Sequence, residues 1–324
     1  MITVEHLTKW YGDFLAVDDL SFEIDEGHVY GFLGPNGAGK STTMNIMAGC
    51  LSATGGRVLI DGYDIFEEPA QAKKRIGYLP EQPPLYMNES PEEYLRFVGE
   101  AKGLRGAELA EQVASVIHQT GIDNVKHRRI SALSKGYKQR VGIAQALLGN
   151  PKVIILDEPT VGLDPIQIIE IRDLIKELGK THTVIFSSHI LSEVQTICDQ
   201  ILIISRGKLA AFGEPKDLEK RLMSANEINL TADLPPAELE TLLQGTAFVE
   251  EVAASVREDG LTAACVRSGH ENIYDVSRSV FQAFAAAGTP LLEMSLKKAN
   301  LEDIFLELTE NQPEEPAEGE EDDA

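Results

Sequence analysis

The stretch GPNGAGKS, residues 34–41, matches the phosphate-binding pattern G-x-x-x-x-G-K-S/T at every fixed position. An apolar run at residues 29–33 precedes it and predicts a buried strand, and residues 42–51 follow with apolar side chains at helical spacing. The glycines allow a tight curl in which successive NH groups point at bound phosphates, at the positive end of the new helix. This context predicts a nucleoside triphosphate site rather than a chance glycine-rich turn.

The loop predicts a role for each of its polar side chains. We expect Lys40 to reach the outer phosphates and Ser41 to ligate Mg²⁺. The residues expected to hold the nucleotide are those of the loop and the one that follows it: Gly34, Pro35, Asn36, Gly37, Ala38, Gly39, Lys40, Ser41 and Thr42.

Length and charge narrow the class of protein. A chain of 324 residues with 43% apolar residues is long enough for two packed domains. Its formal net charge of -23, from 29 basic and 52 acidic residues, opposes the field of nucleic acid and of an anionic bilayer. We therefore expect no nucleic-acid partner and no direct membrane insertion.

Cysteine usage and hydropathy indicate a cytosolic protein. Cys50, Cys198 and Cys265 are isolated in the sequence, which predicts reduced thiols and no metal cluster. The longest apolar runs, such as residues 153–156 and 201–204, are far shorter than the roughly 20 residues of a spanning helix. The first residues lack a basic segment followed by an apolar one, so we expect no signal peptide. Any membrane role must come through a partner chain.

The pattern of elements predicts an α/β fold with a mainly parallel core sheet. Residues 2–33 are typical of short N-terminal strands separated by turns, expected to be antiparallel. Strand patterns recur at residues 153–156, 183–187 and 201–204, with a helical pattern at 166–178. Strands alternating with helices are typical of a parallel sheet covered by helices on its faces.

Residues 88–150 form a predicted helical insertion between strands. Ser90 is a strong helix start, because it is followed by Pro91 and, at the third position, by Glu93. A second amphipathic pattern follows, and a third begins near Ser134. The insertion therefore contains three helices.

The C-terminal part predicts a second, smaller domain at residues 225–310. Its expected order is strand, helix, hairpin, helix, strand and helix, which indicates an α+β unit of the split βαβ type. The last of these helices is expected at residues 301–308. Residues 313–324 are acidic with no basic residue, which predicts a solvated, disordered tail.

Two carboxylates and a histidine suggest phosphate chemistry. Asp157 and Glu158 directly follow the apolar strand 153–156. At that strand end, Asp157 is expected to hold the metal, and Glu158 to act as the general base that orients water toward the γ-phosphorus. His189 ends another strand and offers a donor to the γ-phosphate, while Tyr11 is an aromatic ring able to stack on a base.

Over residues 1–218 the order of motifs resembles the ATP-binding subunit of an ABC transporter. The motifs that carry the resemblance are, in chain order, residues 34–41, Gln82, residues 133–140, Asp157-Glu158, Gly162-Leu163-Asp164 and His189. The resemblance implies a P-loop NTPase fold for residues 1–220 that binds ATP and Mg²⁺ and hydrolyses ATP. It also implies that Tyr11 stacks on adenine, Gln82 contacts magnesium and couples the site to a partner, Asp164 contacts a second subunit, and His189 acts as a switch.

The signature region departs from the commonest family pattern. Where L-S-G-G-Q is usual, this chain has Leu133-Ser134-Lys135-Gly136-Tyr137. Ser134 and Gly136 are retained, and a serine hydroxyl and a glycine NH at a helix start can bind a γ-phosphate presented by another subunit. The variant residues, and the ending at residues 301–309, resemble ABC-2-type exporter ATPases, including multidrug, bacitracin-type and gliding-motility ATPases.

This resemblance implies an assembly of several chains. Two ATP-binding subunits, as a homodimer or as a heterodimer with a related ATPase, would face head to tail with two ATP molecules between them. A separate transmembrane permease subunit would place a helix beside Gln82 and the helical insertion. The chain would then be cytoplasmic and peripheral on the inner face of the cell membrane. ATP binding and hydrolysis would power export.

Two alternatives remain from the sequence. A soluble, non-transport ABC ATPase would usually carry two cassettes with basic surfaces, or a long coiled coil, whereas this chain has one cassette and is acidic. A regulatory adaptor without catalysis is disfavoured by the intact Lys40, Glu158 and His189. The transported substrate cannot be read from a chain that does not contact it.

Overall fold

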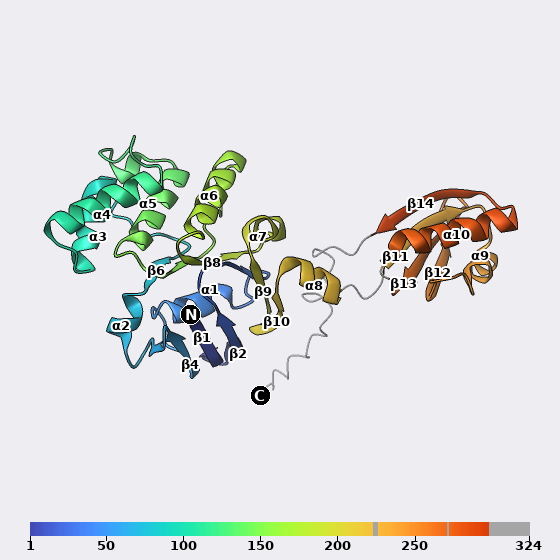
Figure 1. Ribbon diagram of the computed structural model, residues 1–324, viewed down its shortest axis with the longest axis horizontal. Helices are drawn as coiled ribbons and strands as arrows, with labels where there is room; N and C mark the ends of the chain where they lie inside the picture. The colour runs from blue at the N-terminus through green and yellow to red at the C-terminus, as the bar shows by residue number, and fades with distance from the viewer. Residues whose placement is uncertain (223–225, 271, 298–324) are drawn as a thin grey trace, which may run out of the picture. The chain divides into compact units, whose positions relative to one another are not determined.

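The computed structural model describes residues 1–222, 226–270 and 272–297. Its chain divides into two compact units, with the boundary between Pro215 and Lys216 (Figure 1). The first domain was expected to end at residue 220, which lies within helix α8 (Pro215–Leu222). None of the helices in these described ranges is long and apolar enough to cross a membrane.

The core of the first unit is a six-stranded sheet in the order β10-β9-β3-β8-β7-β6. Its strands are parallel except for the antiparallel pair β9 and β10. Their bounds are β3 Val29–Leu33, β6 Ile76–Leu79, β7 Val153–Leu156, β8 Thr183–Ser188, β9 Gln200–Ser205 and β10 Lys208–Gly213. Every residue of β3, β7 and β8 is buried, as expected for parallel strands covered on both faces. The prediction of a mainly parallel core sheet is confirmed.

A second, antiparallel sheet contains the N-terminal strands in the order β2-β1-β4-β5. Its strands are β1 Ile2–Tyr11, β2 Phe14–Ile24, β4 Gly55–Ile60 and β5 Tyr63–Asp64. Helix α1 (Lys40–Met47) shares one apolar core with both sheets, and Met44 and Met47 are fully buried there. Phe22 of one sheet packs edge to face on Phe32 of the other, with ring centroids 5.5 Å apart. The expected antiparallel N-terminal strands are therefore present.

The helical insertion lies between β6 and β7 in the chain. It contains α3 (Pro91–Ala101), α4 (Gly106–Gln119), a short 3-10 helix (Ile130–Ala132) and α5 (Lys135–Leu147). The capping box at Ser90 is present, because its Oγ accepts from the Glu93 NH at 3.4 Å and the Glu93 carboxylate accepts from the Ser90 NH at 2.9 Å. This pairing fixes the start of α3 as the sequence predicted.

Three further helices connect successive strands of the first unit. They are α2 (Pro69–Lys73), α6 (Pro165–Leu178) and α7 (Leu191–Ile197). Only α6 was predicted, because α2 and α7 have five and seven residues and show too little periodicity to be recognised.

The second unit is a four-stranded antiparallel sheet in the order β12-β13-β11-β14, with α9 and α10 on one face (Figure 1). The elements are β11 Asn226–Ala232, α9 Pro236–Leu243, β12 Glu251–Val256, β13 Thr262–Ser268, α10 Ile273–Ala287 and β14 Leu291–Lys297. This order is the split βαβ arrangement that the sequence predicted. The predicted helix 301–308 and acidic tail 313–324 lie outside the described residues.

Gly77 allows α5 to pack directly on strand β6. A Cβ built on Gly77 would lie 2.1 Å from the carbonyl oxygen of Ala146, whereas a Cβ on Gly55 would lie 3.8 Å from its nearest neighbour. The first contact is with backbone, so the helix itself must move to relieve it. Gly77 therefore sets how closely the insertion approaches the core sheet.

We expect Gly77→Ala to lower the free energy of unfolding of the first unit by about 1–3 kcal/mol, the usual cost of overpacking. Gly55→Ala is the matched control and is expected to change it by less than about 1 kcal/mol. Urea denaturation followed by circular dichroism measures both. Equal stability of the two variants would contradict this account of the packing of α5 on β6.

Candidate active site

The phosphate loop connects β3 to α1 and depends on its glycines. Gly37 and Gly39 have φ values of 80° and 100°, which are left-handed conformations that favour glycine. A Cβ on Gly34 would lie 2.3 Å from the carbonyl oxygen of Ile204, and one on Gly39 would lie 2.6 Å from that of Ala16. These close approaches explain why side chains are not accommodated at the two positions.

Lys40 folds back over the loop that precedes it. Its Nζ donates to the carbonyl oxygens of Gly34 at 2.7 Å and Pro35 at 3.2 Å, and the residue is only 5% exposed. Burial lowers the pKa of Lys40, while the nearby carboxylates, first among them Glu158, oppose that shift. An anionic phosphate would favour the protonated form further, so the ammonium is suited to bind one.

A cleft of about 410 Å³ opens beside the loop. The loop contributes Asn36 to Thr42, and Glu158 and His189 line the cleft together with them. This volume lies within the range of small-molecule sites. The structure therefore places most of the predicted phosphate-binding residues on one surface, with Gly34 and Pro35 behind it as acceptors for Lys40.

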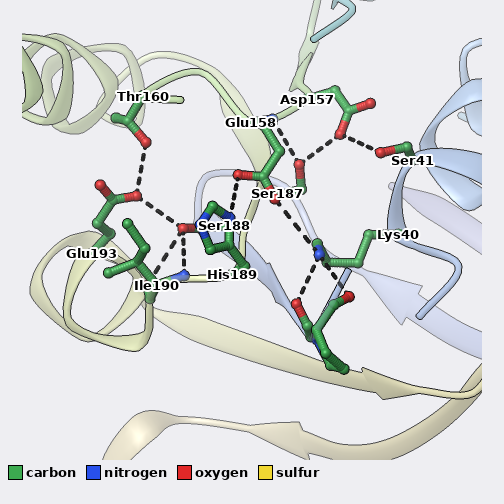
Figure 2. Close-up of polar contacts among 12 residues, drawn as sticks. Lys40, Ser41, Asp157, Glu158, Thr160, Ser187, Ser188, His189, Ile190 and Glu193 are labelled. Atoms are coloured by element: carbon green, nitrogen blue, oxygen red, sulfur yellow. Dashed lines mark hydrogen bonds and ion pairs between the residues drawn. The ribbon is translucent and has the colours of Figure 1, made fainter. Parts of the chain in front are cut away.

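Asp157 directly follows β7 and lies against the loop. Its Oδ1 accepts from the hydroxyl of Ser41 at 3.0 Å and from that of Ser187 at 2.7 Å, and the residue is 2% exposed (Figure 2). A hydroxyl and a carboxylate oxygen so close together form the hard oxygen donor set that Mg²⁺ prefers. Two of the three residues predicted to hold the metal, Ser41 and Asp157, are thus adjacent, and they fit that ion.

Glu158 is at the centre of the polar contacts. Its Oε1 lies 3.6 Å from the Nζ of Lys40, and its Oε2 lies 3.0 Å from the Nδ1 of His189 (Figure 2). Its φ of 45° is a left-handed conformation that is uncommon outside glycine. The NH of Glu158 donates to the Ser187 hydroxyl at 2.7 Å, which holds this backbone in place. The predicted base and the predicted switch histidine are therefore in direct contact.

Tyr11 lines the same cleft, and it is not the only aromatic residue there. Tyr11 is 47% exposed and has the ammonium of Lys9 5.2 Å from its ring centroid. Phe14, at the start of β2, is 62% exposed and also lines the cleft. Phe14 was missed because a single aromatic residue at a strand start is not a motif.

Gln82 does not reach this cleft. It is exposed in the turn after β6, and among the described residues that line the cleft the neighbouring Glu81 is present instead. Its predicted contact with magnesium stays a prediction.

The signature residues line a different pocket. Ser134, Gly136 and Asp164 surround a space of about 390 Å³ that shares no lining residue with the phosphate cleft. Ser134 caps α5, where its hydroxyl accepts from the NH of Tyr137 at 3.4 Å. Asp164 caps α6, where its carboxylate accepts from the NH of Gln167 at 2.9 Å.

The side chain of Gln167, from α6, lies close to the glycine of this pocket. A Cβ on Gly136 would lie 2.6 Å from the side chain of Gln167. Within the described chain, the residues of this pocket are not among those that line the cleft of Lys40 and Glu158.

Comparison with known proteins finds relatives with similar sequences. A model of the ABC transporter family matches residues 17–161. The chain is 35% identical over 310 residues to the linearmycin resistance ATP-binding protein LnrL of Bacillus subtilis strain 168, covering 95% of this chain and 98% of that protein. It is 33% identical over 310 residues to the bacitracin transport ATP-binding protein BcrA of Bacillus licheniformis, covering 95% of this chain and 97% of that protein.

A solved structure matches the first unit. It is the dimeric structure of a post-hydrolysis state of an ATP-binding cassette bound to ADP and Pi, with a TM-score of 0.60 and 25% identity. The match covers 66% of this chain and 98% of that one. The fold around the phosphate loop is therefore that of an ATP-binding cassette.

Proposed function

Because this chain belongs to the family of ABC transporter ATP-binding proteins, we propose that it binds ATP with Mg²⁺ and hydrolyses the ATP to power an ABC-2-type membrane exporter. The observation that carries the proposal is the position of Glu158, between the ammonium of Lys40 and the imidazole of His189 and next to the Ser41–Asp157 pair. Such an arrangement provides a base, a cation and a metal-binding pair around a single γ-phosphate.

Each residue of the cleft has a different role in hydrolysis. The loop NH groups and Lys40 bind and orient the phosphates, since they present donors and positive charge. Glu158 accepts a hydrogen bond from the attacking water and takes its proton as the bond from the water oxygen to the γ-phosphorus forms and the bond from that phosphorus to the ADP oxygen breaks, so that ADP leaves. With an NH on each ring nitrogen, His189 can donate to the γ-phosphate from Nε2 and to the Glu158 carboxylate from Nδ1. Ser41 and Asp157 would hold a Mg²⁺ ion, which would neutralise part of the phosphate charge.

The separate signature pocket supports a site shared by two chains. Ser134 and Gly136 lie at the start of α5, where a hydroxyl and backbone NH groups are suited to bind an anion. In this structure they line a pocket that shares no residue with the cleft of their own phosphate loop. We therefore propose an ATP-driven head-to-tail dimer, with Asp164 at the contact between subunits. A homodimer and a heterodimer with a related ATPase both satisfy this geometry.

An exposed aromatic surface beside Gln82 supports a membrane partner. Tyr86, Met87 and Phe97 are about half exposed, at 52%, 47% and 50%, and the rings of Tyr86 and Phe97 lie 5.2 Å apart. An apolar surface of this kind can receive a helix from a separate transmembrane permease subunit. Gln82 lies in the turn that precedes it, which suits a role in coupling. This docking would hold the chain on the cytoplasmic face of the cell membrane.

The two alternative functions receive less support. Relatives that are similar over 95% of this chain have names that refer to resistance and to bacitracin transport, which favours export over a soluble, non-transport ATPase. The direct contacts of Glu158 with Lys40 and His189 favour a working ATPase over a regulatory adaptor.

Replacing Glu158 by Gln tests whether this carboxylate is the general base. We expect Glu158→Gln to bind ATP with near wild-type affinity and to turn over about 10²-fold more slowly, because the amide cannot take a proton from water. Steady-state phosphate release and nucleotide binding measure the two effects. Glu177→Gln, which changes an exposed carboxylate in α6, is the matched control. Wild-type turnover in Glu158→Gln would remove Glu158 from this role.

Replacing Ser134 by Arg tests the shared site. We expect each Ser134→Arg monomer to bind ATP normally but to remain monomeric, since charge and bulk block the signature pocket from receiving the partner's nucleotide. Light scattering with ATP measures the dimer, and the same exchange at the exposed Ser115 of α4 is the control. An ATP-dependent dimer formed by Ser134→Arg as readily as by Ser115→Arg would rule out the two-chain site.

A further inference from the structure

A buried carboxylate behind the cleft connects the segments that carry Glu158 and His189. Glu193 lies in α7 and is only 2% exposed. Its Oε2 accepts from the Thr160 hydroxyl at 2.8 Å and from the Ser188 hydroxyl at 2.9 Å (Figure 2). Thr160 follows Glu158 with one proline between them, and Ser188 directly precedes His189. One carboxylate oxygen of Glu193 thus links a residue close to Glu158 with the residue next to His189.

Because the Glu193 carboxylate is buried, it needs the two hydroxyl groups as hydrogen-bond donors. Thr160 is 5% exposed and Ser188 is fully buried. A buried carboxylate is costly unless hydrogen bonds replace its lost hydration, and each hydroxyl has a single proton to give. Moving either segment away from Glu193 would leave a buried polar group without its partner. The three side chains therefore favour one arrangement of the two segments.

On the histidine side, the Ser188 hydroxyl fixes a tight turn. Besides donating to Glu193, its Oγ accepts from the NH of Ile190 at 3.0 Å. The hydroxyl therefore links Ser188, which precedes His189, to Ile190, which follows it. Its alternative acceptor, the carbonyl oxygen of Ile190, lies farther away at 3.4 Å. Glu193 thus selects the rotamer of Ser188 that holds this turn.

At Glu158, the backbone has a conformation that needs support from neighbouring contacts. Its left-handed φ of 45° is unfavourable for a residue with a Cβ, and such conformations persist where the surrounding contacts enforce them. The Ser187 hydroxyl holds the NH of Glu158 from one side. The Thr160–Glu193 hydrogen bond holds the chain that leaves Glu158 on the other side.

Helix α7 provides a rigid base for this contact. A Cβ on Gly31 of β3 would lie 2.3 Å from a side-chain carbon of Val194, so α7 packs directly against that strand. Strand β3 leads into the phosphate loop. Glu193 is therefore fixed relative to the loop that binds the phosphates.

We propose that Glu193 is a positioning residue that sets the distance between Glu158 and His189 through Thr160 and Ser188. The inference rests on the proposed function, in which Glu158 is the base. Glu193 does not line the phosphate cleft. Its loss should therefore slow the hydrolysis step while leaving ATP binding intact.

The test compares kcat with ATP affinity in full-length variants. We expect Glu193→Leu and Thr160→Val each to lower kcat about tenfold or more, with KM and the Kd for ATP within about twofold of wild type, because small misplacements of catalytic groups are costly. Glu193→Gln keeps an acceptor oxygen and is expected to retain most of the kcat. Thr120→Val, which removes another buried threonine hydroxyl, is the control and should leave kcat unchanged.

Combining Thr160→Val with Glu158→Gln distinguishes this inference from the proposed function. In Glu158→Gln, adding Thr160→Val is expected to cause no further loss of turnover, since the group that it positions is already absent. An independent, multiplicative loss would overturn the inference, as would a wild-type kcat in Thr160→Val or an equal loss in Thr120→Val. If Glu158→Gln turns over at the wild-type rate, the proposed function fails first. If Glu158→Gln is slow but Thr160→Val is normal, only the role of Glu193 is overturned.

Discussion

The candidate site depends on the hydroxyl of Ser187, at the end of β8. It accepts from the NH of Glu158 at 2.7 Å and donates to Asp157 at 2.7 Å, and Asp157 in turn accepts from Ser41 at 3.0 Å. These bonds connect two strand ends to the start of α1 in a buried environment, where a hydrogen bond is strong and an unmade one is costly. They hold Glu158 in its left-handed conformation and so present its carboxylate to Lys40 and His189.

Much of this arrangement could be predicted from the sequence, because the motifs lie where parallel strands end. Apolar strands followed by Asp157, by His189 and by the glycine loop must bring these residues to one edge of the sheet. The start of α3 at Ser90 was equally predictable, since capping is local chemistry. The split βαβ order of the second unit also followed from alternating patterns and one turn signal.

The rest depends on tertiary contacts that no local pattern records. Ser187 could be placed at a strand end, but its bond to the backbone of Glu158 requires two adjacent strands to be in register. The role of Glu193 depends on how the short α7 packs against Gly31. The exposed position of Gln82 shows that a family motif assigns a residue to a function without fixing where its side chain lies in one conformation.

The central claim is that one molecule carries two half-sites, with Lys40 in one pocket and Ser134 in the other. Mixing a Lys40→Ala chain with a Ser134→Arg chain tests this most directly, because each variant alone lacks an intact site. In a mixed dimer, the wild-type loop of one chain faces the wild-type signature of the other. The account predicts that ATP turnover, which is near zero for either variant alone, recovers on mixing to at most about half of the wild-type value, since each mixed dimer has one intact site of two. Turnover that stays at the level of the separate variants would contradict it.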